Sequence, residues 1–72
     1  MVKGEKRRAY LIAVQQRRGV VRVYAVVALS PEAAVAQVTA KATDDMQVRV
    51  VGGLSRDTAR RLGLTPGEMR LI

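Results

Sequence analysis

The 72-residue chain has no cysteine, histidine, tryptophan or phenylalanine, and only two tyrosines. Without cysteine there is no disulfide and no nucleophilic thiol. Without histidine there is neither imidazole acid–base chemistry nor a Cys/His metal site. No apolar run approaches the ~20 residues that a membrane-spanning helix requires. The composition therefore argues against an enzyme and leaves binding as the function that the side chains best support.

A chain of this length forms at most one domain. Domains of this size bury only about 60% of the surface that the unfolded chain exposes, so the margin of stability is thin. The apolar residues are mainly aliphatic, with twelve valines, ten alanines and six leucines. They suffice for one small core, and dimerisation would add buried surface. A homodimer is therefore one expectation.

Basic residues outnumber acidic ones, because thirteen Lys and Arg stand against six Asp and Glu, for a net charge of +7. The charge is uneven, with +6 over residues 1–22, −2 over residues 23–48 and +3 over residues 49–72. Basic surface attracts polyanions, so the expected partner is a nucleic acid or a nucleoprotein complex. The alternative explanation is that the net charge only keeps a small protein soluble.

Residues 1–8 are predicted to be a basic flexible arm, and residues 9–72 a single domain. An apolar stretch follows the arm, as it would in a signal peptide, but this stretch is only six residues long and no cleavage site follows. We therefore expect a cytoplasmic protein with no membrane partner.

Alternating apolar residues and intervening turn residues predict four strands, over residues 10–15, 20–29, 46–51 and 68–72. The first two form a hairpin, whose polar loop ends at Gly19 and suits a residue at positive φ. Gly52-Gly53 is predicted to break the third strand. A turn with proline at its second position, Thr65-Pro66-Gly67, precedes the fourth.

Two helices are predicted, over residues 33–42 and 56–62. The first follows Ser30-Pro31-Glu32, in which serine is a preferred N-cap, proline suits the first helical position and glutamate complements the helix dipole. Its apolar stripe comprises Ala34, Val35, Val38 and Ala42. The second helix is capped by Ser55 and ends at Gly63.

The ββαβαβ order predicts an α+β fold, with a three- or four-stranded antiparallel or mixed sheet and one main helix packed on one face. The face away from the helix is expected to carry Gln15, Arg22, Tyr24 and Arg49. Such a face is either solvated or available to a partner.

Arginines form two clusters that suit phosphate binding. The first lies at the expected hairpin tip and comprises Arg17, Arg18 and Arg22; the second, on the short helix, comprises Arg56, Arg60 and Arg61. Both patterns also describe ordinary solvated surface. The expected binding residues are Arg17, Arg18, Arg22, Tyr24, Arg49, Arg56 and Arg60. Tyr24 either stacks on a base or covers aliphatic neighbours. No glycine-rich phosphate loop or metal-ligand pattern occurs, so neither a cofactor nor a metal is expected.

Residues 54–68 read Leu-Ser-Arg-Asp-Thr-Ala-Arg-Arg-Leu-Gly-Leu-Thr-Pro-Gly-Glu. This segment resembles part of the AbrB/MazE family of swapped-hairpin DNA-binding proteins, which carry a short helix, then Leu-Gly-Leu-x-Pro-Gly-Asp, then a strand. The resemblance covers about a fifth of the chain. The family's Ile-Pro before the helix is Leu54-Ser55 here. The family's DNA contacts lie mainly upstream of the matched segment, so no contact residue is implied.

A second resemblance covers more of the chain. It rests on four segments: Tyr10-Leu11-Ile12, Val23-Tyr24-Ala25-Val26, Ala28-Leu29-Ser30-Pro31-Glu32-Ala33-Ala34 and Val48-Arg49-Val50. Together they are similar to small phage and mobile-element proteins with a hairpin, a helix entered through an A-x-S-x-x-x-A pattern and a return strand. Some proteins of that build are anti-CRISPR inhibitors of type I systems, which bind the crRNA-guided complex without catalysis.

These observations predict a small, basic, non-enzymatic binding protein that acts on a nucleic-acid machine. An anti-CRISPR inhibitor that sterically occupies a guided complex is the hypothesis that the second resemblance implies. Two alternatives stay open. One is a small DNA-binding transcription regulator or antitoxin of AbrB-like character, and the other is a dimeric assembly protein whose sheet edge pairs with a second copy.

Overall fold

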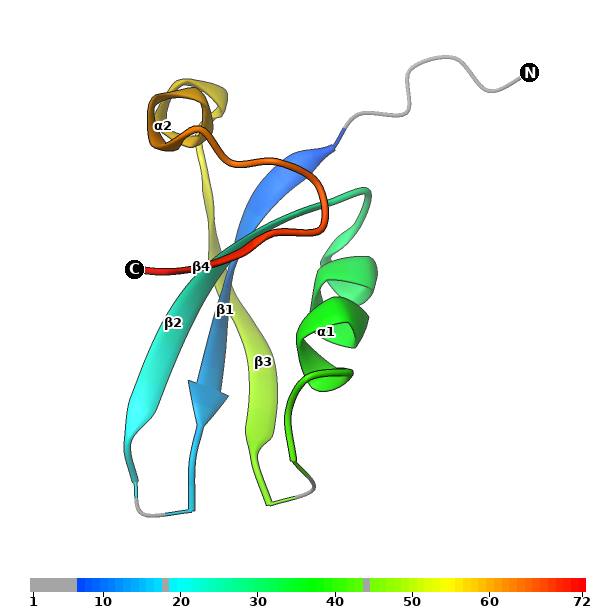
Figure 1. Cartoon of the computed structure of the whole chain (residues 1–72), viewed down its shortest axis with the longest axis vertical. Coiled ribbons are helices and arrows are strands. Elements are labelled where there is room, and N and C mark those ends of the chain that lie inside the picture. The colour runs from blue at the N-terminus through cyan, green and yellow to red at the C-terminus, as the bar shows by residue number, and fades with distance from the viewer. Residues whose placement is uncertain (1–6, 18, 44) are drawn as a thin grey trace, which may run out of the picture.

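The chain folds into one antiparallel four-stranded sheet with two helices, seen in a computed structural model that describes residues 7–17, 19–43 and 45–72 (Figure 1). The elements are β1 (Arg8–Gln15), β2 (Val21–Ala28), α1 (Pro31–Thr39), β3 (Gln47–Leu54), α2 (Arg56–Leu62) and β4 (Met69–Leu71). The strand order is β3-β1-β2-β4. The predicted α+β fold and its ββαβαβ order are confirmed, with four strands and no parallel pair among them.

The β1–β2 hairpin is the centre of the sheet. Its register places Arg8 opposite Ala28 at one end and Gln15 opposite Val21 at the other. The loop is closed by a hydrogen bond of 2.8 Å from the Gln16 N–H to the Val20 carbonyl. Gly19 has φ +83°, as the loop pattern predicts, because a left-handed backbone is accessible to glycine without steric strain.

The hydrophobic core lies between α1 and one face of the sheet. It comprises Ile12, Val14, Val26, Ala28, Ala34 and Val38. The Ser30 hydroxyl caps α1 by accepting a hydrogen bond of 3.0 Å from the Ala33 N–H, and Pro31 is the first helical residue. Ala34 and Val38, one helical turn apart, are the α1 side chains buried against the sheet. The core is therefore aliphatic, as the composition requires.

Two of the four residues predicted on the uncovered face lie on the α1 face instead. Tyr24 is opposite Ile12 and Arg22 is opposite Val14, and directly paired residues of an antiparallel sheet share a face. The uncovered face does carry Gln15 and Arg49, which lies opposite Ala13. The prediction was wrong for Arg22 and Tyr24 because the hairpin register, which decides faces, depends on how the loop closes.

The ends of α1 and β3 differ most from the predictions. The helix α1 ends at Thr39 rather than at residue 42, because the next residues form turns in which Lys41 and Ala42 donate to carbonyls three residues back. Strand β3 continues through Gly52-Gly53, since both glycines pair with β1 beyond a β-bulge.

The predicted arm overlaps the sheet at its end. Arg8, assigned to the arm, is the first residue of β1, and its neighbour Ala9 is 5% exposed. Residues 1–6 lie outside the described part of the chain. Within the described part, no helix has the length and apolar character needed to cross a membrane.

Candidate anion-binding site

Local capping fixes where the helix α2 begins and ends. The Ser55 hydroxyl accepts a hydrogen bond of 3.1 Å from the Thr58 N–H. At the other end Gly63 adopts a left-handed conformation with φ +66° and closes the last turn. These are the two caps that the sequence predicts. They place Arg56 in the first turn and Arg60 in the last turn of the seven-residue helix.

A second set of contacts ties α2 to the sheet. Arg70 of β4 lies opposite Ala25 of β2, on the face away from α1. Its guanidinium donates to the carbonyl oxygen of Leu62, the last residue of α2, and to the Glu68 carboxylate, with 2.9 Å between Nε and Oε2. The Arg70 side chain therefore connects the end of α2 to β4, and its bonds to Glu68 fix its orientation.

Glu68 is held in its ionised form by these contacts. Its carboxylate accepts hydrogen bonds from the Thr65 N–H at 3.1 Å and from Arg70, and both lower the pKa of Glu68 below its ordinary value, the Thr65 contribution being the larger. The Thr65–Glu68 turn places Pro66 second and Gly67, at φ +87°, third, which is the type II pattern.

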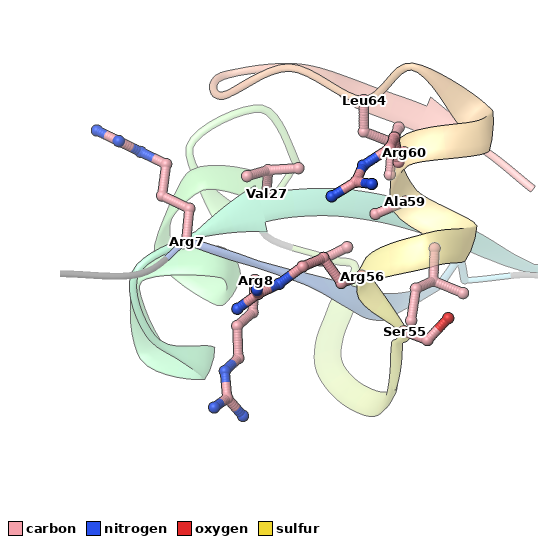
Figure 2. A pocket seen from close by; sticks show the side chains of 10 residues that line it. Arg7, Arg8, Val27, Ser55, Arg56, Ala59, Arg60 and Leu64 are labelled. Atoms are coloured by element: carbon pink, nitrogen blue, oxygen red, sulfur yellow. The ribbon is translucent and has the colours of Figure 1, made fainter. Parts of the chain in front are cut away.

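A hollow of about 390 Å³ opens between α2 and the start of β1 (Figure 2). Its lining residues are Arg7, Arg8, Ala9, Val27, Leu54, Ser55, Arg56, Ala59, Arg60 and Leu64. Ala9 pairs with both Val27 and Leu54, so the hollow lies on the face of the sheet opposite α1. We call this hollow, with the four arginines that line it (Arg7, Arg8, Arg56 and Arg60), the arginine pocket. Arg8 lies opposite Ala28 of the core, and Figure 2 shows the guanidinium groups of Arg7 and Arg8 pointing away from α2.

The arginine pocket concentrates positive charge, although Asp57 stands beside Arg56 on α2. Figure 2 shows Arg56 and Arg60 extending from α2 towards the end of β1 that carries Arg7 and Arg8. Among the described residues that line the pocket, none is acidic. Among the described residues as a whole, the one ion pair joins Arg70 to Glu68, so no described carboxylate forms an ion pair with an arginine of the pocket.

This arrangement suits an anion with several oxygen atoms. Each guanidinium presents its N–H groups as a planar fork that matches two oxygens of a phosphate or carboxylate. The floor of the pocket is apolar, with Ala9 buried and Leu54, Ala59 and Leu64 half-buried. Long aliphatic stems lie favourably along such a floor while their charged ends stay in water. The arginine pocket therefore has side chains that are chemically suited to an oxyanion such as phosphate.

The arginines predicted from the sequence to bind a partner lie in different parts of the structure. Arg56 and Arg60 both line the arginine pocket, whereas exposed Arg17 belongs to the β1–β2 loop. Figure 1 shows this loop at the end of the molecule opposite α2. Arg22 and Arg49 are both exposed, but they lie on opposite faces of the sheet. Arg18 lies outside the described residues. The described members of that predicted set, Arg17, Arg22 and Arg49, therefore do not form one surface.

Tyr24 occupies a structural position. It packs against the core cluster and lines a small hollow with Val38 and Met69. Tyr24 therefore covers aliphatic neighbours, which is one of the two roles that the sequence leaves open for it. Tyr24 does not line the arginine pocket.

Arg7 and Arg8 are the pocket residues that sequence reasoning assigned to the arm instead of to a site. The signal that places them is the alternation of Ala9, Leu11 and Ala13, which extends the first strand back by two residues. Their proximity to α2 has no sequence signal, because nearly fifty residues separate Arg8 from Arg56.

No protein-family model, curated protein or solved structure matches this chain. The fold and the side chains of the site therefore carry the functional argument.

Proposed function

We propose that this protein is a non-enzymatic binding protein that holds phosphate groups of a nucleic acid in the arginine pocket. The observation that supports this most directly is the set of four arginines around one hollow with no acidic lining residue. The net charge of +7 adds a long-range attraction for polyanions, which raises association rates. A cytoplasmic location, where nucleic acids are accessible, belongs to the same proposal.

The expected biological setting is a nucleic-acid machine. Under this proposal, the arginine pocket occupies the path of a nucleic acid or grips an exposed strand, and the rest of the small domain blocks access by its bulk. Inhibition of a crRNA-guided complex is the specific form implied by the resemblance to phage and mobile-element proteins. Arginine suits such contacts because it is enriched at interface hot spots and binds phosphate bidentately.

Direct binding to duplex DNA, as a small regulator or antitoxin, is the second candidate. One observation favours it: α2 ends at Gly63 and leads through the Thr65–Glu68 turn into β4. This is the order of helix, turn and strand in the AbrB/MazE segment that residues 54–68 resemble. The two candidates share the arginine pocket and differ in whether a protein complex is needed.

Salt dependence of binding tests the pocket itself. Two phosphate contacts, from Arg56 and Arg60, predict that the pocket contributes a slope of about −1.8 to the fall of log affinity for a labelled duplex with log salt. The double variant Arg56→Gln/Arg60→Gln should reduce this slope by up to about 1.8. Arg17→Gln/Arg49→Gln removes the same charge away from the pocket and should retain most of the slope. Equal losses in the two double variants would show a net-charge effect only and would refute the pocket.

A second measurement separates the two candidates. A guided effector complex should retain the wild-type protein, but not Arg56→Gln/Arg60→Gln, if the protein is an inhibitor of such complexes. Tight binding to free duplex without retention by any effector would favour the regulator. Binding to neither at low salt would refute both.

A further inference from the structure

The floor of the arginine pocket is an apolar surface that a bound phosphate alone leaves uncovered. Three strands contribute one row to it, because Ala9 of β1 lies opposite both Val27 of β2 and Leu54 of β3. Ala59 of α2 and Leu64, which follows the helix, also line the hollow. Ala9 is 5% exposed and the other four are half-buried, so part of their apolar surface remains in contact with water. A ligand that covers this floor gains free energy that a phosphate on the arginines does not supply.

The floor and the arginines together match the two parts of an unpaired nucleotide. A base has flat faces that stacking hides in a duplex and that a single strand leaves available. The hollow of about 390 Å³ is at the small end of the range for small-molecule sites, about 300–1,000 Å³, and suits one base with its sugar. A duplex backbone brings phosphates to the arginines but keeps its base faces away from the floor.

Arg56 and Arg60 are placed to hold both parts of such a nucleotide. They lie one helical turn apart, and Figure 2 shows both side chains extending from the same side of α2. A guanidinium group binds phosphate through its N–H groups and packs against a base through its flat face. One of the two arginines can therefore hold the phosphate while the other lies against the base.

We propose that the arginine pocket binds one unpaired nucleotide of a single-stranded nucleic acid, with the base on the apolar floor and a phosphate at Arg56 or Arg60. The proposal rests on the proposed function and deepens it by naming the state of the strand. Little preference among the four bases is expected. Among the described lining residues, Ser55 alone has an uncharged polar side chain, and its hydroxyl is already bonded to Thr58.

Strands with and without bases test the proposal on the wild-type protein. The probe is a labelled thymidine strand of about ten nucleotides, measured by fluorescence anisotropy. The comparison strand has the same length and the same phosphates, but its sugars are abasic. The thymidine strand should bind about tenfold more tightly, because it alone can cover the floor.

The outcomes separate this proposal from the proposed function. Equal affinities for the two strands, both reduced in Arg56→Gln/Arg60→Gln, would overturn the base site and leave a pocket that binds phosphate. Binding of neither strand and of no duplex at low salt would refute the proposed function, and the base site with it.

Filling the hollow without changing its charge tests the proposal from the side of the protein. Ala59→Leu adds apolar bulk to the lining, and leucine is nearly as good a helix former as alanine. The variant should bind the thymidine strand about tenfold more weakly, with its duplex affinity and its salt slope unchanged. An equal loss for strand and duplex, or no loss for either, would contradict a base on the floor.

The matched control is Ala33→Leu, the same change at an exposed position of α1 that does not line the pocket. It should leave both affinities unchanged, and an equal loss of strand binding in this variant would also contradict the proposal. Thermal unfolding of the two variants shows whether each retains the fold. If Ala59→Leu unfolds, the comparison of thymidine and abasic strands on the wild-type protein decides.

Discussion

The guanidinium group of Arg70 donates a hydrogen bond to the carbonyl oxygen of Leu62 and thereby joins β4 to the last turn of α2. The same group bonds to Glu68, so one side chain links the turn, the strand and the helix. Since α2 carries Arg56 and Arg60, this link also orients half of the arginine pocket.

Replacement of Arg70 by methionine should loosen α2. The change keeps an apolar stem but leaves the Leu62 carbonyl without its donor. Because Arg70 is 37% exposed, water compensates in part, and we expect a loss of about 1 kcal/mol in the free energy of unfolding. Urea unfolding and amide hydrogen exchange in α2 measure it. Arg49→Met is the control on the same face, and faster exchange in both variants would contradict a specific role for Arg70.

The lowered pKa of Glu68 predicts a pH dependence of stability. A carboxylate whose pKa is lower in the folded state than in the unfolded one stabilises the fold above the unfolded value, near 4.5, and loses this effect as pH falls through the folded value. Glu68→Gln should therefore be less stable than wild type at neutral pH, with the difference shrinking below pH ~4. Urea unfolding between pH 2.5 and 7 tests this, and a constant difference would contradict it.

Removing each serine cap in turn should distinguish a loss of overall stability from a loss of duplex binding. Ser55→Ala and Ser30→Ala each remove a hydroxyl that accepts a helix N–H, and each should lower the free energy of unfolding by about 1 kcal/mol. Ser55→Ala should also weaken duplex binding, because it frays the helix that carries Arg56 and Arg60. Thermal unfolding and fluorescence anisotropy provide the comparison. Weaker duplex binding in Ser30→Ala than in Ser55→Ala would be inconsistent with the pocket.

Burial predicts which valine or isoleucine matters to stability. Ile12 is fully buried in the core, so Ile12→Ala should cost about 2–4 kcal/mol through lost transfer energy and the cavity left behind. Val21 is 51% exposed, and Val21→Ala should change stability by less than about 0.5 kcal/mol. The shift of the denaturant midpoint of each variant relative to wild type, at an unchanged m-value, measures both changes in stability. A small effect of Ile12→Ala would mean that the core is placed wrongly.

The helix caps and turns were predictable because their physical cause is local. Ser30 and Ser55 satisfy free N–H groups within three residues of their own positions, and Gly63 supplies a left-handed residue that any helix end of this type requires. The face of Tyr24 was not predictable in this way. Alternation alone shows that Tyr24 and Val23 point to opposite sides, and pairing with Ile12 decides which side is buried.

The amino-acid sequence by itself determined the class of fold, the N-caps of both helices, the C-cap of α2, the aliphatic core and the presence of Arg56 and Arg60 on one helix. Only the tertiary structure decided that Arg7 and Arg8 complete a pocket with them, and that Arg22 and Arg49 lie on opposite faces. The physical reason is the range of the interactions. Caps and periodicity act over a few residues, whereas a site shared by β1 and α2 exists only once the sheet brings distant segments together.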